Sequence, residues 1–108
     1  MENTVGIVNK DIVMEALKAV MDPELRLGIV DLGLIYGVDV ENSGKDVEVR
    51  MSLTSPGCPY GPQIVNEVRF VAGSLPGVEN ADVRVIWDPP WDPRTMASDE
   101  IKDKLGLW

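Results

Sequence analysis

Cys58 is the only cysteine in a chain of 108 residues that contains no histidine. It lies in the segment of residues 54–62, where three prolines and two glycines restrict the backbone and indicate a fixed loop. Without histidine the chain offers no Ser/His or Cys/His catalytic pair, and a single cysteine forms neither an intrachain disulfide nor a zinc knuckle. Thiol or soft-metal chemistry must therefore use Cys58, and partners would have to supply any further ligands.

The place of Cys58 in the chain favours a reactive thiol. Apolar residues recur with a helical period from Ile64 to Leu75, so Cys58 is expected at or just before the start of a helix. The unpaired N–H groups and the positive dipole end of a helix start stabilise a thiolate, which is a good nucleophile and metal ligand. The alternative is an inert, buried cysteine, which is common for this residue type.

Three acidic side chains, Asp22, Glu24 and Asp31, fall in the loop expected after the first helix. If they face Cys58, they are candidates for hard-oxygen metal ligands, for an acid/base pair, or for charges that raise the thiol pKa by repulsion. Residues of this type more often accept hydrogen bonds from nearby backbone N–H groups, so capping of the loop is the alternative.

Four further residues are candidates to line the same site. Thr54 and Ser55 have hydroxyl groups that can donate to a sulfur atom, although a hydrogen bond within the turn is the commoner role. Pro90 and Trp91 form a rigid aromatic corner, which is typical of an interface anchor. Covering the hydrophobic core is the alternative role of Trp91.

The hydrophobic pattern predicts the order α-β-β-α-β-α. Asn9 is the expected N-cap of a helix whose apolar face includes Ile12 and Val20 and which ends at Asp22-Pro23. Alternation predicts a hairpin of residues 34–41 and 46–53, then a third strand with Val83, Val85 and Trp87 directed inward. A short last helix is expected between the N-cap Ser98 and the C-cap Gly106.

This order predicts a single α/β domain of the two-layer α+β type, residues 1–108, with a loose arm at residues 1–8. The helix at residues 64–75 connects strands two and three by a crossover, so these strands are expected to be parallel in a small three-stranded mixed sheet. Sites form at the carboxyl ends of such strands. The loops that contain Asp22 to Asp31, Cys58, and Asp88 to Trp91 should therefore meet at one end of the sheet.

The charge balance argues against nucleic acid as a partner. The chain has 18 acidic and 10 basic residues, a net charge of −8, and no cluster of Lys and Arg to neutralise phosphates. The charge fits a role in solubility, with a preference for a basic partner surface as the alternative. No apolar run approaches the roughly 18 residues of a membrane span, and no basic, apolar leader is present. We therefore expect a cytoplasmic protein with a reduced thiol and no membrane contact.

An ordered set of motifs resembles the SufT/PaaD-like metal–sulfur cluster biosynthesis family, called MIP-eighteen-type in eukaryotes. The set is Asp22-Pro23-Glu24, the segment of residues 29–36 (IVDLGLIY), the segment of residues 54–59 (TSPGCP), and Pro89-Pro90-Trp91. The resemblance extends from about residue 9 to residue 106. Gly28 replaces the asparagine that many members have before Ile-Val-Asp, and a cysteine-rich C-terminal extension of the PaaD type is absent.

The resemblance implies an accessory factor that carries or delivers iron–sulfur clusters, with Cys58 as the reactive cysteine and Asp22, Glu24 and Asp31 in the acidic motif positions. Iron or a cluster would be bound transiently through Cys58. The implied partners are the iron–sulfur assembly machinery, apo-client proteins, and in one arrangement a second copy that shares the cargo. Two alternatives are a metal-free interaction module that aids oxygenase or metalloprotein assembly, and a Cys58-dependent enzyme. The enzyme ranks last, because no histidine is present to accept the thiol proton.

Overall fold

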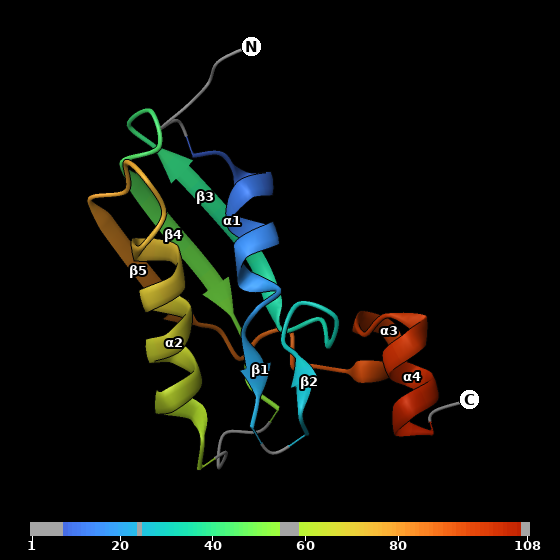
Figure 1. Ribbon diagram of the computed structural model, residues 1–108. Coiled ribbons are helices and arrows are strands. Elements are labelled where there is room, and N and C mark those ends of the chain that lie inside the picture. Colours follow the sequence, from blue (N-terminus) through green and yellow to red (C-terminus); the bar gives the residue numbers. More distant parts are fainter. Residues whose placement is uncertain (1–7, 24, 55–58, 107–108) are drawn as a thin grey trace.

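The computed structural model describes residues 8–23, 25–54 and 59–106. Its helices and strands follow one another in the order shown in Figure 1. They are α1 (Lys10–Leu17), β1 (Met21–Asp22), β2 (Leu27–Gly28), β3 (Ile35–Glu41), β4 (Asp46–Met51), α2 (Gly61–Gly73), β5 (Asn80–Val85), α3 (Pro93–Met96) and α4 (Asp99–Leu105). Among the described residues, no helix is long and apolar enough to cross a membrane.

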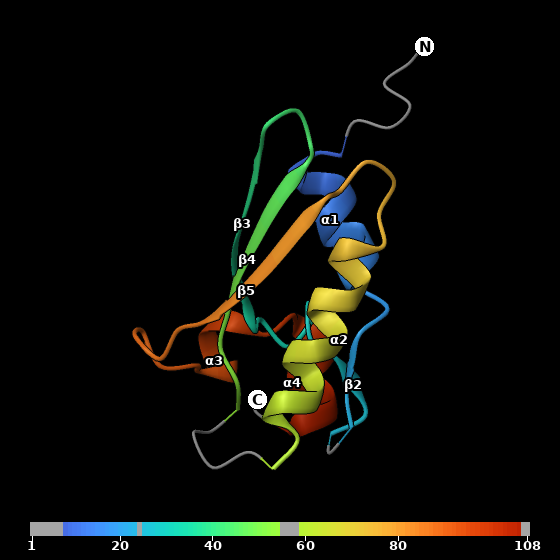
Figure 2. The same cartoon turned by 90° about the vertical axis from the view of Figure 1, so that its left-hand side faces the viewer.

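The main sheet has the order β3-β4-β5. β3 and β4 are antiparallel, and β4 and β5 are parallel, which confirms the mixed sheet and the crossover through α2. α1 and α2 lie on the same face of this sheet (Figures 1 and 2). The structure adds two elements that the sequence did not predict: the short antiparallel pair β1–β2 within the expected loop, and α3.

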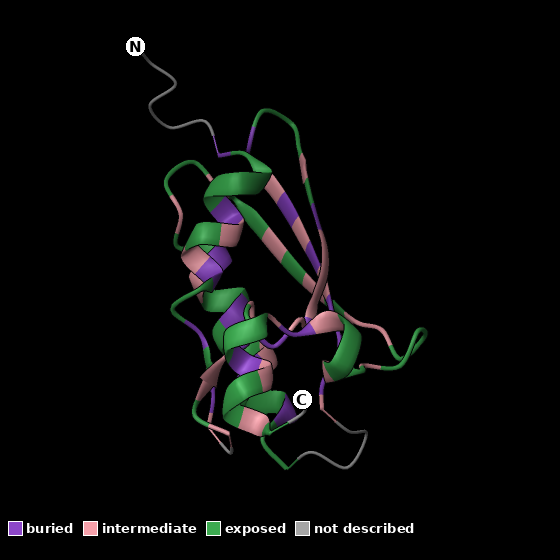
Figure 3. Cartoon of the chain, turned by 90° about the vertical axis from the view of Figure 1, so that its right-hand side faces the viewer, coloured by how far each residue is buried: buried purple, intermediate pink, exposed green. Residues whose placement is uncertain are grey.

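The core lies between the sheet and the helices. In β4 the burial alternates strictly: Val47, Val49 and Met51 are buried, whereas the residues between them are partly exposed. Figure 3 shows burial classes that alternate along strands of the sheet, in purple and pink or in green and pink. α2 contributes Ile64, Val68 and Ala72 at helical spacing. The apolar faces predicted from strand alternation and from helical spacing therefore pack together in one hydrophobic core.

The first helix is shorter than its apolar pattern suggests. The Asn9 side chain accepts a hydrogen bond from the Ile12 N–H at 2.9 Å, which confirms the cap. The helix ends at Leu17, so the expected end at Asp22-Pro23 is wrong. The physical reason is a competing bond, since the Val20 carbonyl accepts from the Ile29 N–H at 3.0 Å and extends the β1–β2 pair. Ile12 is 41% exposed and does not belong to the buried face.

The C-terminal half agrees with the sequence at its caps and differs at Trp87. The Ser98 hydroxyl accepts from the Ile101 N–H, and Gly106 ends α4 with φ 70, which confirms both caps. Trp87 was expected to point inward, but it lies beyond the last residue of β5 and is 44% exposed. Val8, the last residue of the expected arm, is buried, and residues 1–7 lie outside the described part.

Candidate functional site

Three segments that are far apart in the sequence meet at one end of the sheet. The Ser52 N–H, just after β4, donates to the Leu34 carbonyl at 2.8 Å. The Trp91 indole N–H, from the loop after β5, donates to the Leu32 carbonyl at 2.7 Å. The segment that enters β3 therefore joins the segment that leaves β4 and the segment that follows β5. Cys58 and Ser55 lie outside the described residues, so their place at this junction stays a prediction.

Trp91 packs at the edge of the hydrophobic core. Its side chain is partly buried and packs against the hydrophobic core, and its only polar atom is used in the bond to Leu32. Leu32 is fully buried, so this bond satisfies a carbonyl that water does not reach. Pro90 beside it is exposed. The geometry favours the core-covering role of Trp91 and leaves Pro90 as the accessible residue of the pair.

Asp22 is a buried structural residue. Its side chain has an exposed fraction of 0%, and its Oδ1 atom accepts from the Leu25 N–H at 3.0 Å. Its backbone carbonyl accepts from the Arg26 N–H at 2.7 Å, and Arg26 adopts a positive φ of 58. These bonds close the turn between β1 and β2, which is the capping role that the sequence left open. Glu24, in the same turn, lies outside the described residues.

Asp31 and Thr54 differ in how far they reach the surface. Asp31 is exposed, and its backbone carbonyl accepts from the Ser98 N–H at 2.8 Å, which ties the loop before β3 to the start of α4. The Asp31 charge also contributes to the raised pKa of Lys18, although the larger causes are the hydrogen bond and the charge of Glu15. Thr54 is half-buried at the end of the segment that leaves β4.

The helix that follows Cys58 begins later than expected. Its first residue is Gly61 and its N-cap is Tyr60, so Cys58 precedes the cap by two residues. Within the described residues, no side chain caps the first turn of α2 and no acidic residue lies in it. The first turn therefore has no carboxylate of its own, and the dipole of α2 favours negative charge at this end.

Gly33 and Tyr36 hold the junction together, although neither residue was predicted from the sequence to belong to the site. Gly33 has φ 81, and a Cβ atom there would lie 2.2 Å from the Met96 carbonyl oxygen, so only glycine allows α3 to approach. The Tyr36 hydroxyl donates to the Pro89 carbonyl at 2.7 Å. Both residues lie inside the quoted motif of residues 29–36, which was the available signal. With Met96 they border an open pocket of about 610 Å³, whose lining also includes Val30, Ile35 and Pro89.

No group of three or more carboxylate or thiol side chains among the described residues, which leave out Cys58 and Glu24, has a geometry that could hold a metal ion.

Comparison with known proteins connects this arrangement to one family. The family described as iron–sulfur cluster assembly protein matches residues 10–85. The Fe–S protein maturation auxiliary factor YitW of Bacillus subtilis is 44% identical over 98 residues, which cover 91% of this chain and 94% of the relative. The Fe–S protein maturation auxiliary factor SufT of Staphylococcus aureus is 44% identical over 88 residues, which cover 82% of this chain and 98% of that relative.

The fold has a close counterpart among solved structures. A crystal structure of a domain of unknown function from Bacillus anthracis superimposes with a TM-score of 0.82 at 38% sequence identity, and the match covers 92% of each chain. Sequence and fold thus agree over most of the chain, and they confirm the resemblance stated from the motifs. This chain belongs to the family of iron–sulfur cluster assembly proteins.

Proposed function

We propose that this protein is a non-enzymatic accessory factor in the maturation of iron–sulfur proteins. It takes iron or a cluster as cargo through the Cys58 thiolate and presents that cargo to apo-client proteins. The observation that carries the proposal is the place of the thiol in the chain. Cys58 follows Thr54 in the segment that leaves β4, directly after the junction where Ser52 and Trp91 connect three loops.

Family membership supports the choice of cargo. The match to the iron–sulfur cluster assembly family extends over residues 10–85 and therefore includes Cys58. Two relatives of nearly the same length have the name Fe–S protein maturation auxiliary factor. The first turn of α2, which contains no acidic residue, supports a thiolate form of the sulfur, because its N–H groups favour negative charge nearby.

The number of ligands determines how the cargo is held. Iron–sulfur clusters are bound by several cysteine or histidine side chains, usually four, whereas this chain has one cysteine and no histidine. We propose that Cys58 contributes one ligand and that the client or the assembly machinery contributes the others. Asp31 and Pro90, both exposed at the junction, would border the cargo, whereas Asp22 maintains the turn behind it.

Transfer to an acceptor tests this function. The protein is reconstituted anaerobically with ferrous iron and sulfide, desalted, and mixed with an apo-ferredoxin as the acceptor. Visible circular dichroism then reports cluster assembly on the acceptor. We expect transfer from the wild type and none from Cys58→Ser, with Ser52→Ala, which keeps the thiol and the backbone N–H, as a control whose fold is verified by circular dichroism.

Two results would contradict the proposal. Equal transfer by Cys58→Ser would remove the thiol from the function and favour a metal-free interaction module. Cysteine-dependent turnover of a small substrate, without any transfer, would favour a thiol enzyme.

A further inference from the structure

β5 forms an uncovered edge of the sheet. Within the described residues it pairs only with β4, and it is the strand nearest the viewer in Figure 2. Its inward apolar side chains are half-buried, whereas the equivalent residues of β4 are buried. The three half-buried side chains are Ala81, Val83 and Val85. An exposed edge with apolar residues on one face is a template for pairing with another strand.

The opposite edge strand, β3, is irregular at its first residues, whereas β5 is regular throughout. The pairing of β3 with β4 shifts register between Ile35 and Gly37, and the Tyr36 hydroxyl there is bound to the Pro89 carbonyl. A bulge of this kind hinders the addition of a further strand at that end of β3. β5 keeps an unbroken register with β4 over its full length.

The existing hydrogen bonds determine which β5 groups point outward. The Asn80 N–H donates to the Lys45 carbonyl at 3.0 Å, and the Ile86 N–H donates to the Met51 carbonyl at 2.7 Å. In a parallel ladder every second residue directs both its N–H and its C=O to the neighbour. Even-numbered residues of β5 therefore face β4. The backbone groups left for a further strand belong to Ala81, Val83 and Val85.

Charge distinguishes the registers centred on Asp82, Val83 and Arg84 for a second copy of the same strand. Antiparallel pairing must place odd residues opposite odd residues, because these have the outward backbone groups. If Ala81 faces Val83, Asp82 meets its own copy, and if Val83 faces Val85, Arg84 meets its own copy. With Val83 opposite Val83, each Asp82 faces the other copy's Arg84. We propose that β5 pairs antiparallel with β5 of a second copy in this last register, which joins the two three-stranded sheets into one.

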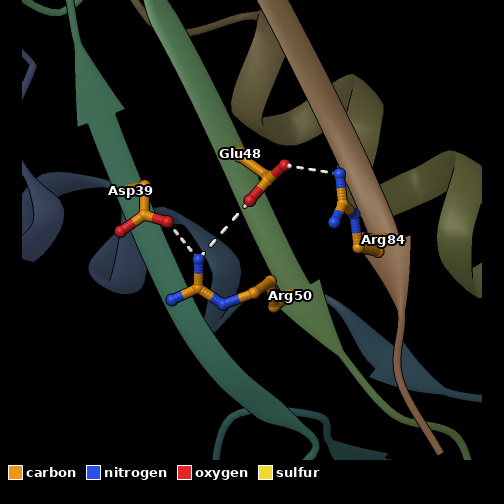
Figure 4. Close-up of polar contacts among 4 residues, drawn as sticks. All are labelled: Asp39, Glu48, Arg50 and Arg84. Atoms are coloured by element: carbon orange, nitrogen blue, oxygen red, sulfur yellow. Dashed lines mark hydrogen bonds and ion pairs between the residues drawn. The ribbon is translucent and has the colours of Figure 1, made fainter.

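The side chains on the exposed face fit this pairing. Asp82 and Arg84 lie on the face away from the helices, with Arg84 66% exposed and 3.4 Å from Glu48 (Figure 4). In an antiparallel pair they occupy non-hydrogen-bonded positions, where opposing side chains are closest. β5 contributes only six residues per copy, compared with roughly 20–30 in a standard interface. The dimer is therefore weak and depends on concentration.

This dimer separates the two ends at which β4 continues toward Thr54. The strands of the second copy run in the opposite direction, so the two Thr54 residues lie at opposite ends of the extended sheet. Met51 is level with Val85, two residues from the symmetry axis, and Thr54 follows three residues later. At about 3.3 Å per residue, the two Met51 positions, where the β4 strands end, are roughly 13 Å apart along the strands. The proposed pairing therefore places the two junctions at different ends of the joined sheet.

Complementary charge reversals test the register. In Asp82→Lys each introduced lysine faces Arg84 of the other copy, and in Arg84→Glu each introduced glutamate faces Asp82, so each variant alone has two repulsive pairs. A one-to-one mixture of the two variants restores two attractive pairs. Sedimentation velocity over a concentration series measures association, with Lys10→Glu as a charge-reversal control far from β5. Circular dichroism verifies that each variant is folded.

We expect the wild type and Lys10→Glu to approach twice the chain mass as concentration rises. Each β5 reversal should lower the association constant at least about tenfold, because two attractions become repulsions. The mixture should regain the association constant of the wild type. The Val83 amide hydrogen should exchange more slowly in the dimer than in the single chain. A wild type that remains at the mass of one chain, a dimer that survives both reversals, or a mixture that stays monomeric would each overturn the proposal. None of these readouts depends on Cys58.

Discussion

Replacing Trp91 tests whether the junction at the end of the sheet contributes to stability. The partly buried indole packs against the core, and its N–H satisfies the Leu32 carbonyl at 2.7 Å. Losing about 100 Å² of buried apolar surface, roughly half of what a Trp buries, costs about 2.5 kcal/mol. Leaving the buried carbonyl without its donor adds about 1 kcal/mol. We therefore expect Trp91→Ala to lower the free energy of unfolding by about 3–4 kcal/mol.

Two further variants separate the parts of this effect. Trp91→Phe keeps most of the ring contact and loses the N–H, so its expected cost is about 1 kcal/mol. Trp87→Ala removes a tryptophan that is 44% exposed and lies only four positions away in the chain. Its expected cost is also about 1 kcal/mol, because less apolar surface is lost.

Urea denaturation followed by far-ultraviolet circular dichroism measures all three variants against the wild type. The expected order of stability loss is Trp91→Ala well above Trp91→Phe and Trp87→Ala. If Trp91→Ala costs no more than Trp87→Ala, Trp91 does not hold the three segments together.

Three other predictions concern the thiol, a close contact and a surface carboxylate. The alkylation rate of Cys58 by iodoacetamide should show a pH midpoint below the unperturbed value of about 8.5, and a midpoint at or above it would contradict the thiolate. Gly33→Ala should lower the melting temperature sharply, because its Cβ would lie 2.2 Å from the Met96 carbonyl oxygen and φ is 81 at this position. The Cβ atom of Gly106→Ala would meet no atom within 4 Å, so this variant should lower the melting temperature less. Hydrogen bonds from Asn80 and Asn42 hold the pKa of Asp46 below its ordinary value of 3.8, so the extra stability of the wild type over Asp46→Ala should be present at neutral pH. It should disappear as pH falls below 3.8, and a difference in urea midpoint that is constant with pH would contradict the assignment.

Patterns within short segments of the sequence predicted the helix caps and most of the sheet correctly. The Asn9 and Ser98 caps, the hairpin around β3 and β4, and the parallel crossover all follow from side-chain type and hydrophobic period. β1 and β2 have two residues each, which is too short for any period to appear. Their pairing nevertheless ends the first helix early, because it uses the Val20 carbonyl.

The candidate site was predictable only as a set of segments. Alternation could not show that Trp91, and not Trp87, packs against the core. β5 ends at Val85, and the packing of residues beyond it depends on long-range contacts such as the bond to Leu32. The role of Asp22 was open for a similar reason, since a capping carboxylate and a metal ligand have the same sequence pattern. Burial and the bond from the Leu25 N–H show that Asp22 caps its turn, while its place at the site stays a prediction.

The central claim is that the Cys58 thiolate binds iron or an iron–sulfur cluster as cargo. Native mass spectrometry of protein reconstituted anaerobically with ferrous iron and sulfide tests it most directly, because the mass reports metal content and the number of chains together. We predict that the wild type gains the mass of iron or of a cluster and that Cys58→Ser, equally folded by circular dichroism, gains none. Equal metal content in both proteins, or no added mass in the wild type, would contradict the claim.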